Sequence, residues 1–207
     1  MQPKVKLELV AHEGSRVVVQ DVVVTGIGKG GSGGNVLFVQ APLAPSHGGI
    51  EVNLGSAKPT VQVGELVDVT GTYIERYEVS QLTDTPEVVS KGVPGSPIKP
   101  VDVSPGEIWD EGGMAEAYES MLVRVVDVEV VNENPDKPKD FGEFAIWEVG
   151  GTAPTQGGLR VDDYLNGVGA HPAKGTRYSH IIGIGGYSFG HRKIYPRTLN
   201  DLVISGR

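Results

Sequence analysis

The chain of 207 residues contains no cysteine, which excludes disulfide bonds, thiolate nucleophiles and zinc sites with thiolate ligands. No apolar run approaches the roughly 20 residues that a transmembrane helix needs, so no membrane span is predicted. Aromatic residues make up only 6% of the chain. Anionic side chains outnumber cationic ones by 26 to 18, giving a net charge of -8. This balance opposes nonspecific attraction to the phosphates of nucleic acid.

Glycine and proline are abundant, with 30 and 14 copies, and they interrupt short runs rich in valine. Such a composition predicts an all-β protein with very little helix. The best helical fragment is Met114–Tyr118, which is too short to be stable without tertiary support. A single capped turn is also expected over residues 162–167.

The strand pattern occurs twice along the chain, which predicts two similar units. Asp21 and Phe38 recur at the same spacing as Asp127 and Phe144, and we expect both phenylalanines to be core residues at matching positions. The boundaries are predicted as a first barrel with an N-terminal strand over residues 1–89, a Pro/Gly-rich linker over 90–117 and a second barrel over 118–207.

Each unit is predicted to contain five strands. The expected ranges are 16–27, 35–40, 49–53, 66–74 and 77–82 in the first unit, and 122–132, 143–149, 158–161, 178–185 and 191–195 in the second. Five strands with long loops after the first strand and between the third and fourth match an OB-like Greek-key barrel. A seven-stranded immunoglobulin-like sandwich would need two further strands in each unit. Along the sixth predicted strand, alternation with acidic residues predicts that one set of side chains faces the core: Leu122, Val126, Val128 and Val130.

The segment 26–31 fits the G-x-G-x-x-G pattern of dinucleotide-binding proteins. That site needs a helix after the glycines, but the strand-like segment 35–40 follows, so a hairpin loop is predicted. Ser32 lies in a G-x-S-x-G pattern in the same loop. It lacks both the following helix and a recognisable acid/base partner, so it is not predicted to be a nucleophile.

Neither a metal site nor a cofactor is predicted. The five histidines do not show the spacing of metal ligands. Asp136, Asp140, Asp162 and Asp163 either supply oxygen ligands to calcium or form a solvated acidic loop with a helix-capping aspartate.

A ligand-binding surface is predicted where aromatic rings and cations occur together, because barrels of this type stack polymer units on rings in a positively charged groove. The predicted ligand contacts are Tyr73 and Tyr77 in the first unit, and Trp147, Tyr187, Phe189, Arg192, Lys193 and Arg197 in the second. The alternative role for such rings is to fill the ends of the barrels.

Several segments resemble the OB-fold-like module found beside extracellular bacterial nucleases and phosphoesterases. They are 158–163, 182–184, 187–190 and 193–197 in the second unit, and 38–40, 63–65, 69–72 and 81–82 in the first. The resemblance implies an accessory, nucleic-acid-binding role in a secreted or surface protein, although a cytoplasmic location is left open.

We therefore expect a noncatalytic tandem binding module rather than an enzyme. Its expected ligand is an extended polymer, either single-stranded nucleic acid or glycan. The alternative is a structural or protein-interaction domain of a surface protein, with a protein partner and no polymer ligand.

Overall fold

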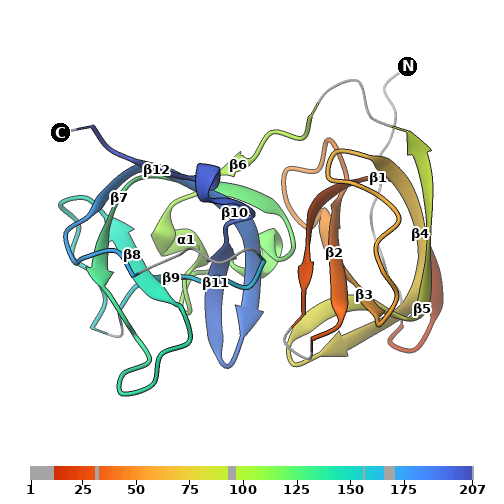
Figure 1. Cartoon of the computed structure of the whole chain (residues 1–207), viewed down its shortest axis with the longest axis horizontal. Coiled ribbons are helices and arrows are strands. Elements are labelled where there is room, and N and C mark those ends of the chain that lie inside the picture. Colours follow the sequence, from red (N-terminus) through yellow and green to blue (C-terminus); the bar gives the residue numbers. More distant parts are fainter. Residues whose placement is uncertain (1–11, 31–32, 93–96, 156, 166–170, 207) are drawn as a thin grey trace.

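The computed structural model describes residues 12–30, 33–92, 97–155, 157–165 and 171–206. As predicted, the protein is nearly all β and forms two barrel units (Figure 1). The first barrel closes in the order β1-β2-β3-β5-β4. Its strands are β1 (Arg16–Lys29), β2 (Asn35–Gln40), β3 (Gly49–Gly55), β4 (Leu66–Arg76) and β5 (Val79–Gly92).

The second barrel repeats this connectivity as β7-β8-β9-β11-β10, and the pairing of β10 with β7 completes the ring. Its strands are β7 (Leu122–Asn132), β8 (Phe144–Glu148), β9 (Leu159–Val161), β10 (Arg177–Ser188) and β11 (His191–Tyr195). Two short strands extend the sheet, since β6 (Val101–Asp102) pairs with β7 and β12 (Leu202–Ile204) pairs with β10. The turn η2 (Leu199–Asp201) precedes β12.

The segment predicted as a linker packs largely against the second barrel. It contains β6, the one-turn helix α1 (Pro105–Ile108) and the 3-10 turn η1 (Glu116–Tyr118). The fragment predicted to be helical, Met114–Tyr118, forms only the turn η1. Val103 and Ile108 are buried in the core of the second barrel. At the start of this segment, β5 of the first barrel continues to Gly92, beyond the end of that barrel predicted at residue 89. No helix in the described residues is long and apolar enough to cross a membrane.

The two repeated aspartates share an unusual backbone conformation in the first strand of each barrel, with a φ of 54° at Asp21 and 50° at Asp127. At Asp21 the pairing of β1 with β4 shifts register, between Val19 and Val22, which is a bulge. At Asp127 the pairing of β7 with β10 keeps its register, yet the alternation of faces breaks there: Val125 and Val128 are core residues, whereas Val126 is 46% exposed. The prediction that Val126 faces the core is therefore wrong.

Phe38 and Phe144 are both buried, but they do not occupy matching positions. In the first barrel Leu37 pairs with Val52, and in the second Phe144 pairs with Val161. In the structure Phe144 therefore corresponds to Leu37, whereas in the sequence repeat it corresponds to Phe38. This register shift of one residue places Phe38 and Phe144 on opposite faces of their sheets. Phe144 lies in the core of its barrel, whereas Phe38 points outward from the first barrel.

The two barrels lie side by side (Figure 1). They pack against each other through an apolar cluster that contains Phe38. The buried members of the cluster are Val36, Phe38, Leu122, Leu165, Ile184 and Tyr195. Gly28 allows this close approach, because a Cβ there would lie 2.5 Å from the side chain of Leu165. The predicted hairpin after residue 26 is confirmed by the pairing of Lys29 with Asn35; Ser32 lies outside the described residues.

Candidate ligand-binding face

The outer face of the second, third and fifth strands can be compared between the barrels position by position. In the first barrel, Phe38 pairs with Glu51, which pairs with Gln81. The corresponding row in the second barrel runs from Ala145 through Arg160 to Lys193. In OB barrels this side of the sheet and the loops joining strands one to two and four to five receive the ligand. These faces and loops are therefore the candidate ligand-binding surfaces of the two barrels.

In the first barrel this face is covered by the second barrel. Gly49 lies so close to it that a Cβ would be 2.4 Å from the carbonyl carbon of Ser120. The side chain of Gln40 accepts a hydrogen bond from the backbone N–H of Leu122, at 2.8 Å. Glu51 and Gln81 are both buried. A polymer ligand therefore has no access to this face while the barrels remain docked.

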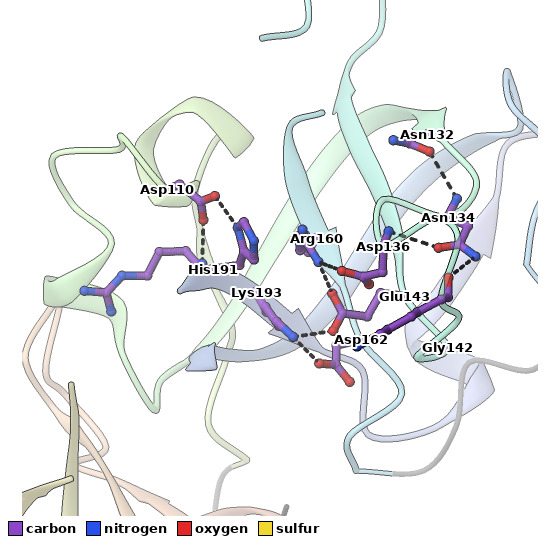
Figure 2. A network of polar contacts seen from close by, with 12 residues as sticks. Asp110, Asn132, Asn134, Asp136, Gly142, Glu143, Arg160, Asp162, His191 and Lys193 are labelled. Carbon is purple, nitrogen blue, oxygen red and sulfur yellow. Dashed lines mark hydrogen bonds and ion pairs between the residues drawn. The ribbon is translucent and has the colours of Figure 1, made fainter. Parts of the chain in front are cut away.

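In the second barrel the same face carries a network of ion pairs (Figure 2). Lys193 donates to Glu143 and, at 2.9 Å, to Asp162. Arg160 donates to Asp136 at 2.7 Å and to Glu143 at 2.9 Å. Two cations side by side on one face repel each other, so the three carboxylates are needed to hold Arg160 and Lys193 together. The Lys193 side chain is only 1% exposed.

Three of the four acidic residues considered as calcium ligands have side-chain partners within the protein. Asp136 and Asp162 belong to the ion-pair network, and Asp140 contacts His171 at 2.8 Å. Burial raises the pKa of Asp162 to about 6, while the neighbouring Lys193 opposes this rise. The other oxygen of Asp162 accepts the N–H of Tyr164, at the start of the predicted turn. Within the described ranges, no group of three or more potential ligands could hold a metal ion.

Two of the predicted ligand contacts, Trp147 and Lys193, have buried side chains. Trp147 is 9% exposed and packs edge-on against Trp109, with ring centroids 5.6 Å apart. The ammonium group of Lys193 belongs to the internal network. Tyr73 is half-buried, and its hydroxyl contacts Glu75 at 3.1 Å. These side chains therefore support the fold.

Within the part of the chain that the structure describes, the other two predicted cations pair with carboxylates instead of lining a positive groove. Arg192 donates to Glu116 at 2.7 Å and to Glu119 at 3.0 Å. Arg197 donates to Asp201 at 2.9 Å, next to the turn η2. Asp110 accepts from the backbone N–H of Arg192 and contacts the ring of His191 at 2.7 Å (Figure 2). The sequence prediction missed these acidic partners, since they lie far from Arg192 along the chain.

Two of the predicted aromatic residues are exposed at hairpin tips. Tyr77 is 80% exposed between β4 and β5, and Phe189 is 96% exposed between β10 and β11. Each is the first residue of a two-residue turn, because Arg76 pairs with Val79 and Ser188 with His191. The two positions correspond in the repeat, since both hairpins join the fourth and fifth strands.

Both turns need a backbone conformation that aromatic residues adopt unwillingly. The φ angles are 53° and 62° at Tyr77 and Glu78, and 52° and 84° at Phe189 and Gly190. Two-residue turns of this kind prefer Asn-Gly, because positive φ costs other L-residues on the order of 1 kcal/mol. An exposed aromatic residue is thus kept in both barrels at a position where the backbone disfavours it.

The two tips are neighbours in space, at the lower side of the view in Figure 1. Glu78 from the first barrel forms a hydrogen bond with the hydroxyl of Tyr187, which raises the pKa of that tyrosine. Arg192 covers the ring of Tyr187, with its guanidinium carbon 4.7 Å from the centroid. We call the surface formed by Tyr77, Glu78, Tyr187 and Phe189 the tip edge.

One further exposed ring was missed by the sequence prediction. Phe141, 59% exposed, lies in the loop between the first two strands of the second barrel, with Lys139 5.9 Å from its centroid. In OB barrels the loop between the first two strands is one of the two loops that contact the ligand. The sequence signal for the exposure of Phe141 was a lone aromatic residue in a polar loop of proline, lysine and aspartate.

No protein-family model matches this chain, and no curated protein matches it in sequence. The features of the chain that bear on a ligand are therefore the tip edge and the charges around it.

Proposed function

We propose that this protein is a noncatalytic binding module that holds an extended, uncharged polymer of the glycan class against its tip edge. The observation that carries the proposal is the duplicated exposure of Tyr77 and Phe189 in strained turns. Strained backbone persists where the side chain has a function that offsets its cost. Neither ring is buried in a core, so contact with a ligand explains why both are aromatic.

The charges around the tip edge support a neutral ligand. Arg192 and Lys193 are each paired with two carboxylates. Arg76 covers the ring of Tyr77 at 5.3 Å, but it lies between Glu75 and Glu78 in the sequence. Binding of nucleic acid depends on cations that displace counterions from phosphates. A sugar chain instead needs an apolar ring surface with polar groups beside it, which the tip edge provides.

The proposal is tested by measuring affinity for a panel of soluble polysaccharides by affinity electrophoresis, followed by calorimetry on those that bind. The variants Tyr77→Asn and Phe189→Asn remove each ring and introduce asparagine, which tolerates positive φ. Stacking contacts contribute about 1–3 kcal/mol per ring, so each substitution should weaken binding by about fivefold or more. Leu43→Asn, which alters another exposed apolar side chain, is the matched control and should bind normally.

Single-stranded DNA at low salt provides the discriminating comparison. If the protein bound DNA tightly and no polysaccharide, the neutral ligand class would be wrong. If a polysaccharide bound equally well to Tyr77→Asn, Phe189→Asn and the wild type, the binding site would lie away from the tip edge.

A further inference from the structure

Two glutamates from different barrels are buried where the barrels meet. Glu51, on β3, is 6% exposed, and Glu119, just before β7, is 7% exposed. We call the interface between the two barrels the joint. Glu119 spans it, since its carboxylate accepts a hydrogen bond from the backbone N–H of Ser80 on β5, at 2.9 Å. Docking of the barrels therefore removes both carboxyl groups from water.

The groups around these two carboxyls are mostly acidic. Glu119 faces Arg192 from β11, Glu116 from η1 and Glu75 from β4. Glu51 faces Glu119. The hydroxyl of Tyr73 lies near Glu75 and Glu119, and the hydroxyl of Tyr195 lies near Glu51 and Asp162. Among the described residues that act on Glu51 and Glu119, Arg192 is the one cation. One guanidinium cannot balance four carboxylates, so the joint is rich in negative charge.

Hydrogen-bond donors are also scarce next to Glu51. Its carboxyl group accepts from the side-chain amide of Gln81, at 3.1 Å. The other atom of that amide, Oε1, is buried without a hydrogen-bond partner in the part of the chain that the structure describes. A proton on Glu51 would remove one negative charge and add one donor. Both the charge balance and the hydrogen-bond inventory thus favour the protonated form.

We infer that the docked state of the two barrels holds a proton at Glu51, and that the joint between them loosens when this proton is lost. The pKa values agree with this geometry: burial raises the pKa of Glu51 to about 7, and the charge of Glu119 adds to the rise. Burial likewise raises the pKa of Glu119 to about 7. The inference goes beyond the proposed function and does not depend on any ligand.

The direction of the pH effect follows from linkage. A carboxyl group whose pKa is higher in the docked state than its ordinary value of 4.5 favours docking fully below pH 4.5. This contribution is lost as the pH rises through about 7. If opening returns Glu51 to water, the open fraction of the joint should increase on the order of 50-fold between pH 5 and pH 8.

Amide hydrogen exchange on the intact protein measures this opening. The N–H groups of His47 and Leu122 donate across the joint, to the carbonyl of Ala117 and the side chain of Gln40. After correction for intrinsic exchange, their protection should fall from pH 5 to pH 8, while amides in the β1–β2 pairing should change little. Glu51→Gln should keep the protection at pH 8 close to its value at pH 5. Glu87→Gln, an exposed glutamate of the same barrel, should behave as the wild type does.

Three results would overturn the inference. The first is protection in the wild type that does not change with pH, and the second is an undiminished pH dependence in Glu51→Gln. If that variant does not fold, carbon-13 titration of Glu51 in the wild type decides instead, and a midpoint near 4.5 would be the third. None of these measurements involves the tip edge, so they are independent of the glycan proposal.

Discussion

Replacing Tyr77 and Phe189 together by asparagine should make this protein more stable while removing its proposed ligand contacts. Relief of the positive φ should contribute on the order of 1 kcal/mol at each site. The two cation–ring contacts are lost, namely Arg76 at 5.3 Å from the centroid of Tyr77 and Lys193 at 5.9 Å from that of Phe189, which costs about 0.5 kcal/mol at each exposed site. The net gain is then about 1 kcal/mol, or roughly 2–4 °C in Tm for a chain of this size.

Thermal and urea unfolding of the double variant would measure this gain. Leu43→Asn, at an exposed residue without positive φ, should stay within about 0.5 kcal/mol of the wild type. A loss of more than about 1 kcal/mol in the double variant would show that the rings support the fold, against the strain argument. Greater stability combined with weaker binding would be typical of residues kept for function.

Three further substitutions test the packing on which the site depends. Lys193→Met leaves Asp162 without its cation and Glu143 with Arg160 alone, and it should lower the free energy of unfolding by about 3–5 kcal/mol, measured by urea denaturation. Trp147→Ala should cost about 3–5 kcal/mol but leave polysaccharide affinity unchanged; a loss of affinity would restore Trp147 as a ligand contact. Gly28→Val places a Cβ against Leu165 and should abolish amide protection across the joint while preserving the β-sheet signal in circular dichroism. Gly113→Ala, where a Cβ meets nothing within 4 Å, is its control, and normal protection in Gly28→Val would contradict the packing.

The strands could be predicted because their signals are local. Valine-rich runs between glycine and proline clusters gave ten ranges that agree with the observed barrel strands to within a few residues at most ends, apart from the longer fifth strand. The hairpin at residues 26–31 was also predictable, since another strand-like segment follows it. Phe189 lies between two predicted strands, as observed, whereas Tyr77 was predicted to begin a strand and lies instead in the turn before it.

The faces of the strands were less predictable. The positive φ at Asp127 interrupted the alternation around Val126, and a slip of one residue turned Phe38 outward. Neither event changes the composition of the strand in which it occurs. Both depend on how neighbouring strands pair, and so on residues far away in the sequence.

The sequence by itself determined that the chain is all β, that it repeats one strand pattern and that its hairpin tips carry aromatic residues. Only the tertiary structure decided that the repeated units are not equivalent. The second barrel covers the ligand-side face of the first, and distant carboxylates neutralise Arg192 and Lys193. Such contacts join residues with no fixed sequence separation, so no local pattern encodes them, whereas strand formation depends on neighbours along the chain.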